Sequence, residues 1–114
     1  MLDPQEIRKE WQEAEIKKME ARKEEAKRIF QWILKLFRKN FEEGYFGSAI
    51  SVWQFDGSNE LNSGSDKYDM RYDREVMYPI ICEVINSEEG YRASYRKDAA
   101  YYDENAWELT VKIE

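Results

Sequence analysis

The sequence predicts an α+β fold in which one long N-terminal α-helix is followed by a curved four-stranded antiparallel β-sheet packed on its C-terminal half. Three observations support this prediction. Residues 5–43 contain no Gly or Pro. After Gly44 the spacing of apolar residues changes from three or four to two, and short turn sequences separate the extended segments. A helix followed by closely connected strands favours an antiparallel sheet with the helix across one face.

The helix is expected to begin at Pro4 and to end before Gly44, which makes it about 39 residues and roughly 58 Å long at 1.5 Å per residue. The carboxylate of Asp3 can accept a hydrogen bond from the N–H of Glu6, and Glu6 can bond back to the N–H of Asp3. Pro4 then occupies the first helical position, where its missing N–H costs nothing.

The two halves of this helix differ in character. The second half carries one broad apolar stripe formed by Ala26, Ile29, Phe30, Ile33, Leu36, Phe37 and Phe41. The first half has only a narrow stripe, and residues 17–28 are almost wholly charged. Because a compact domain of 100 residues has a radius of gyration of only about 13 Å, we expect residues 1–25 to overhang a single α+β body formed by residues 26–114.

Four extended segments are expected in this body. They comprise residues 45–55, 68–84, 91–96 and 107–113, with a polar loop at residues 56–66. The second segment would span about 60 Å as one strand, so we expect a bulge or bend near Arg74 or Pro79. The expected core joins Ile29, Phe30, Ile33 and Phe37 of the helix to Ile80, Val84, Trp107, Leu109 and Val111 of the sheet.

Charge is unevenly divided along the chain. Residues 1–43 hold 11 Lys and Arg against 10 Asp and Glu, for a net charge of +1, whereas residues 44–114 hold 7 against 14, for −7. An acidic body repels phosphate backbones, so we expect no direct nucleic-acid binding and a partner protein with a basic surface. No apolar stretch approaches a membrane span, and a single cysteine fits a soluble cytoplasmic protein.

Nothing in the sequence indicates catalysis, a metal site or a cofactor. The chain has no histidine, and therefore lacks the commonest general base and metal ligand. Cys82 falls among the inward positions of an expected strand, where a thiol is usually buried and inert. We therefore expect a protein that is not an enzyme and binds no metal or cofactor.

Two groups of residues are candidates for binding other proteins. The first combines aromatic area with carboxylates and consists of Tyr102, Asp103, Glu104, Asp69 and Asp73. Tyr102 is expected to be more exposed than Tyr101, because neighbours in an extended chain point opposite ways. The second group is the narrow helical stripe of Ile7, Trp11 and Ala14, which needs cover from a second copy of the helix, a partner's groove or a fold-back of the sheet.

These features favour a small non-enzymatic, inhibitor-like interaction module whose acidic sheet body binds a basic site on another protein and imitates the charge of nucleic acid. By analogy, small inhibitor proteins that are carried by phages and mobile elements often have this build. The alternative is a ligand-binding α+β protein, natural or de novo designed, with an aromatic-lined cavity between the helix and the curved sheet. Binding that is indifferent to both salt and charge reversal would count against the first hypothesis, and a small ligand that raises the melting temperature would then support the alternative.

Overall fold

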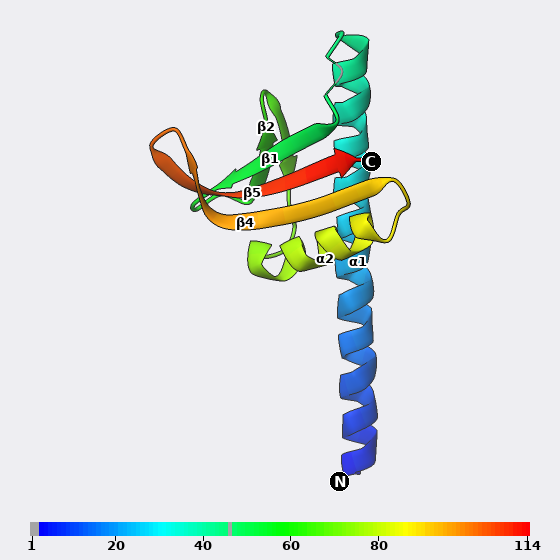
Figure 1. The fold of residues 1–114 in the computed structure, drawn as a ribbon. Coiled ribbons are helices and arrows are strands. Elements are labelled where there is room, and N and C mark those ends of the chain that lie inside the picture. Colours follow the sequence, from blue (N-terminus) through cyan, green and yellow to red (C-terminus); the bar gives the residue numbers. More distant parts are fainter. Residues whose placement is uncertain (1–2, 46) are drawn as a thin grey trace.

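The computed structural model describes residues 3–45 and 47–114. Along the chain the elements are α1 (Pro4–Glu42), β1 (Ala49–Phe55), β2 (Glu60–Ser63), β3 (Asp66–Asp69), α2 (Arg74–Asn86), β4 (Tyr91–Tyr101) and β5 (Glu104–Ile113). The strands form one antiparallel sheet in the order β3-β2-β1-β5-β4. The N-terminal half of α1 projects far from the body, and the molecule measures 65 Å along its longest axis (Figure 1).

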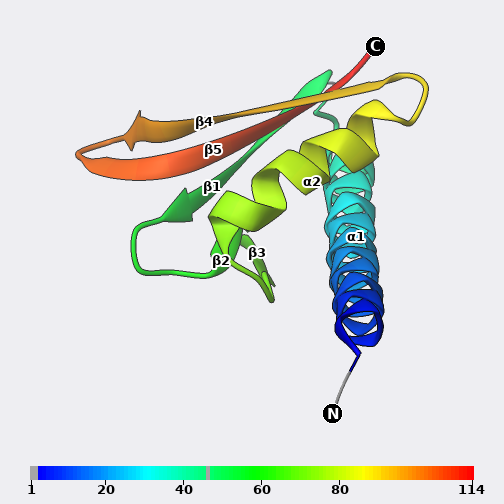
Figure 2. The ribbon, with the colours of Figure 1, turned by 90° about the horizontal axis from the view of Figure 1, so that it is seen from below.

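Both helices cover the same face of the sheet. Strands β1, β5 and β4 form one layer, α2 lies against it, and the β2–β3 hairpin curves out of the layer beside α1 (Figure 2). An ion pair holds this hairpin to the helix, with Lys39 Nζ 2.9 Å from Asp66 Oδ2. The rings of Trp32 and Tyr68 also lie 5.6 Å apart, centroid to centroid. The sheet is therefore curved around the C-terminal half of α1.

The prediction of a helix from Pro4 to Glu42 is confirmed, and the helix has 39 residues. Its N-cap is Asp3, whose Oδ1 accepts a hydrogen bond of 3.0 Å from the N–H of Gln5 rather than from that of Glu6. The chain leaves the helix through Gly44, whose φ of 89° lies in the left-handed region that glycine adopts without a steric cost.

The prediction of a strand across residues 74–84 is wrong, because this segment forms α2. The even positions are apolar, but Met77, Ile81 and Ile85 are apolar as well and are four residues apart, which places them on one helical face. All three are fully buried. Pro79 lies inside the helix at an exposed position and not at a bulge, so α2 lacks the hydrogen bond from that residue to the carbonyl of Glu75.

The sheet has five strands and not the expected four. The extra hairpin, β2 with β3, covers part of the expected loop at residues 56–66 and the first residues of the strand expected at 68–84. It turns at Gly64, which has a φ of 61°, and Leu61 pairs with Tyr68 across it. Leu61 is fully buried, so this pair adds an apolar contact with the core to the polar contacts that hold the hairpin against α1.

The core lies between the two helices and the inner face of the sheet. Every residue expected in the core is buried except Val84, which is partly buried against it. The members of the expected core that are buried are Ile29, Phe30, Ile33, Phe37, Ile80, Trp107, Leu109 and Val111. Helix α1 enters this core at Glu25, and residues 3–21 are exposed throughout.

A matched pair of substitutions on α1 tests this division of the helix. Ile33 is fully buried and Ile16 is 57% exposed. Ile33→Ala should lower the free energy of unfolding by about 3 kcal/mol, because it loses buried apolar surface and leaves a cavity. Ile16→Ala should change it by less than about 0.5 kcal/mol. Urea titration followed by circular dichroism measures both, and equal losses would contradict the assignment.

Candidate functional site

An aromatic cluster lies on the face of the sheet that the helices leave uncovered. In β1, Trp53 and Phe55 alternate with the buried Val52 and Gln54, so their side chains point away from the core. The ring of Tyr101 at the end of β4 lies 4.9 Å from that of Trp53 and 5.3 Å from that of Phe55. The register of β1, β5 and β4 therefore brings together three rings that are far apart in the sequence.

Tyr102 extends this cluster at the tip of the β4–β5 hairpin. Its side chain is 87% exposed, and its ring lies 4.7 Å from that of Tyr101. The two rings do not point in opposite directions as expected, because Tyr102 lies in a turn with a φ of 53°. This left-handed conformation costs roughly 1–2 kcal/mol for a residue with a Cβ. We call Trp53, Phe55, Tyr101 and Tyr102 the aromatic patch.

Carboxylates form one edge of the aromatic patch. Asp103 and Glu104 are both exposed, and Glu104 pairs with Tyr101 across the hairpin. Further along the same face, Arg96 donates from Nε to Glu108 Oε1 at 2.7 Å, so these two charges offset each other. The hairpin tip consequently presents aromatic rings beside a negatively charged rim made of Asp103 and Glu104.

The structure separates the other two candidate acids from this tip. Asp69 ends β3, and Asp73 is the N-cap of α2, where its side chain makes no capping hydrogen bond. Both are exposed, and the end of β3 and the start of α2 lie away from the tip of the β4–β5 hairpin (Figure 2). Only Tyr102, Asp103 and Glu104 of the first candidate group are thus brought together.

The second candidate group lies on the projecting part of α1. Ile7, Trp11 and Ala14 are all exposed, and Trp11 has 63% of its surface accessible. The sheet does not fold back over them, because its strands pack on the other half of the helix. Of the three covers considered for this stripe, a second copy and a partner's groove remain.

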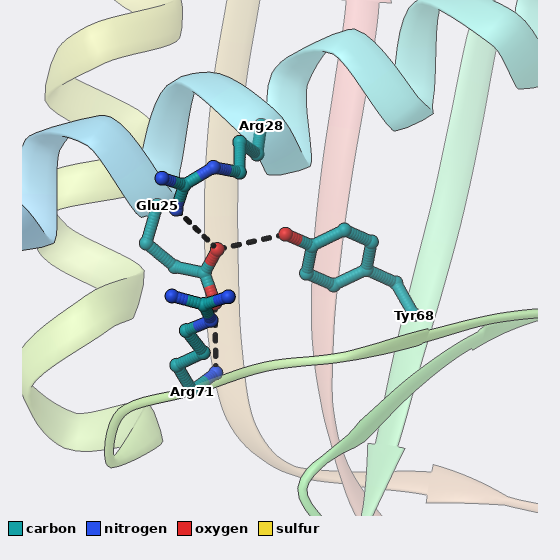
Figure 3. A network of polar contacts seen from close by, with 4 residues as sticks. All are labelled: Glu25, Arg28, Tyr68 and Arg71. Carbon is teal, nitrogen blue, oxygen red and sulfur yellow. Dashed lines mark hydrogen bonds and ion pairs between the residues drawn. The ribbon is translucent and has the colours of Figure 1, made fainter.

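A buried carboxylate that the sequence analysis missed lies where α1 enters the body. Glu25 is fully buried, and its Oε1 accepts a hydrogen bond of 2.7 Å from the hydroxyl of Tyr68 (Figure 3). Its Oε2 accepts one of 2.8 Å from the backbone N–H of Arg71, and Arg28 Nη1 lies 3.4 Å from Oε1. The sequence signal for this network is the position of Glu25. It comes four residues before Ile29 and therefore lies on the helix face that carries the apolar stripe.

In the ranges 3–45 and 47–114, no three His, Cys, Asp or Glu side chains converge to hold a metal ion, and no helix is long and apolar enough to cross a membrane. Cys82 lies on α2 and not on a strand. It is partly buried, and burial raises the pKa of its thiol to about 11, which keeps it protonated at neutral pH.

Comparisons with protein-family models, with curated proteins and with solved structures find no match to this chain.

Removing the hydroxyl of Tyr68 tests the buried network. Tyr68→Phe should lower the free energy of unfolding by about 1–2 kcal/mol at pH 7, because the carboxylate of Glu25 loses a donor. Tyr45→Phe is the control, since Tyr45 is 66% exposed, and should change it by less than about 0.5 kcal/mol. Denaturant titration measures both, and equal effects would contradict a stabilising role for the network.

Tyr68→Phe should also change how the free energy of unfolding depends on pH in alkaline solution. Burial and the hydrogen bond to Glu25 raise the pKa of Tyr68 from 10.0 to about 12. The stabilisation from its neutral phenol is therefore complete below pH 10 and is lost as the pH rises through 12. Between these pH values, the stability of Tyr68→Phe should fall less steeply than that of the unmodified protein. Parallel slopes would contradict this assignment.

Two substitutions of Tyr102 measure the cost of its backbone conformation. Tyr102→Gly and Tyr102→Ala both remove the ring, but only glycine adopts the φ of 53° freely. The free energy of unfolding should be about 1 kcal/mol higher for the glycine variant than for the alanine variant. Thermal unfolding compares the two. A more stable alanine variant would mean that the turn imposes no strain on this residue.

Proposed function

We propose that this protein is a small non-enzymatic interaction module that binds another protein through the aromatic patch and its acidic rim. The observation that carries the proposal is Tyr102, a large ring held 87% exposed in a left-handed conformation. A residue kept at a cost to the fold is a candidate for function. Tyrosine is also among the residues that contribute most to binding at protein interfaces.

Charge favours a partner with a basic surface. Residues 44–114 carry a net charge of −7, and Asp103 and Glu104 place part of it beside Tyr102. Such a surface attracts cationic sites and repels nucleic acid and anionic lipid. The module would act like an inhibitor by occupying a basic site, including one that otherwise binds nucleic acid.

The alternative of a ligand cavity between helix and sheet has less support. The side chains of Ile33, Leu109 and Val111 fill that space and are fully buried. A groove does run between α1 and α2, with Phe30 and Tyr91 among its lining residues. It lies outside the sheet-to-helix core, so it does not match the expected cavity.

Site-specific photo-cross-linking identifies the partner directly. A benzophenone side chain at position 102 should cross-link a basic protein in a lysate of the source cells. The same probe at Glu89, an exposed residue in the turn at the other end of β4, is the control and should not capture that protein. The absence of any species specific to position 102 would count against the proposal.

Binding kinetics with the purified partner test the roles of ring and charge. Asp103→Lys/Glu104→Lys should slow association at least tenfold at low salt, because it reverses the charge of the rim. Glu88→Lys/Glu89→Lys makes the same change of charge in the distant turn and should slow association less. Tyr102→Ala should act mainly on dissociation. Association that is equally fast in all variants and at 0.5 M salt would refute electrostatic recognition of a basic site.

A further inference from the structure

We propose that two copies of this chain associate through the projecting segment of α1, defined as residues 4–21, with the two segments packed side by side and antiparallel. The proposal is independent of the function assigned to the aromatic patch. It starts from the exposed stripe of Ile7, Trp11 and Ala14, which continues to Ala21. There it reaches a hollow lined by Lys17, Lys18, Ala21, Arg22 and Tyr72, where α1 enters the body.

The spacing along the stripe is that of a helix-packing seam. Ile7, Ala14 and Ala21 are seven residues apart, and Trp11 and Lys18 fall four residues after the first two of them. This alternation of four and three residues is the heptad pattern by which two helices pack together. Ile16 and Met19 are exposed elsewhere on the circumference and do not belong to the seam.

One antiparallel register overlaps the two segments completely. Because the segment runs from 4 to 21, facing residues in this register have numbers that add up to 25. Trp11 then faces Ala14 of the second copy, and a large side chain meets a small one. Ile7 faces Lys18 of the second copy, whose aliphatic stem can cover it. Pro4 faces Ala21 of the second copy, so the first turn of each helix reaches the point where the helix of the other copy enters its body.

In this register the charges that flank the seam are complementary. Arg8 lies beside Glu15 of the second copy, and Glu10 lies beside Lys17 of the second copy. The two-fold symmetry repeats both pairs and gives four ion pairs across the interface. Asp3 is the exception, because it lies beside Glu24 of the second copy at the open end of the interface. Glu24 has Lys27 of its own chain 3.3 Å away.

Other arrangements of the same seam bring like charges together. In a parallel pair, Glu10 would lie beside Glu15 of the second copy, and Lys17 beside Arg22 of the second copy. If the antiparallel register moves by one heptad toward the bodies, Glu15 lies beside Glu15 of the second copy and Lys17 beside Lys17 of the second copy. If it moves by one heptad the other way, the same happens to Arg8 and Glu10. Charge complementarity thus selects the register that also gives the longest overlap.

Sedimentation equilibrium of the full chain, from roughly 10 to 500 μM, tests the association, since an interface of this small size is expected to be weak. The unmodified protein should approach the mass of a dimer. Trp11→Ala should remain a monomer, and Ile16→Ala, which removes an equally exposed apolar side chain off the seam, should dimerise normally. A monomeric unmodified protein, or a Trp11→Ala variant that dimerises normally, would overturn the proposal.

A charge exchange tests the antiparallel register. Arg8→Glu places two acids side by side at both ends of the seam and should weaken dimerisation at least tenfold. Adding Glu15→Arg should restore it, because each pair is then reversed. Glu15→Arg alone distinguishes the two orientations. It should weaken the antiparallel dimer, in which it places two basic residues side by side, whereas it would strengthen a parallel dimer, in which it removes the repulsion between Glu10 and Glu15. Circular dichroism confirms that all variants fold, and failure of the rescue would refute this register.

Discussion

The buried carboxylate of Glu25 determines where the exposed, projecting segment of α1 ends and the segment that packs in the core begins. A charge removed from water is tolerated only where donors satisfy it. Here the donors are the hydroxyl of Tyr68 and the backbone N–H of Arg71, which belong to β3 and to the connection before α2. The same contacts hold the β2–β3 hairpin and the start of α2 against α1. Residues 3–21 lie before this network and are exposed, whereas the apolar stripe after it is buried from Ala26 to Phe37 and ends at the exposed Phe41.

Local signals made α1 predictable, and their absence explains the errors elsewhere in the fold. Asp3, Pro4 and Gly44 mark its ends, and nothing between them interrupts a helix. In α2 the local signals conflict, because Pro79 disfavours a helix interior while Met77, Ile81 and Ile85 require a helix to be buried together. Tertiary burial outweighs the proline, which itself stays on the exposed side. The β2–β3 hairpin escaped prediction because the contacts that hold it, from Tyr68 to Glu25 and from Asp66 to Lys39, join residues far apart in the sequence.

The candidate site was predictable only where it is contiguous in sequence. Tyr102, Asp103 and Glu104 are neighbours in a turn, so exposure and charge could be read from their composition. Trp53 and Phe55 join them through pairing of β1 with β5 and of β5 with β4, which no local pattern specifies. Asp69 and Asp73 resemble the tip residues in composition, yet they lie at the end of β3 and at the start of α2, away from the β4–β5 hairpin, because residues 74–86 form a helix and not a strand.

Trp11 and Tyr102 depart from the rule that large apolar groups are buried, and neither departure helps the fold. Trp11 lies on the projecting segment of α1 and Tyr102 lies on a hairpin tip, and each is exposed over more than half of its surface. Departures of this kind are expected where a surface serves binding. The two exposed surfaces are also compatible with each other, because an antiparallel pair of projecting α1 segments would hold the two bodies at opposite ends of a stiff helical spacer. A partner with repeated basic sites at a matching distance would then be bound through both aromatic patches, and the second contact would form at a high effective concentration.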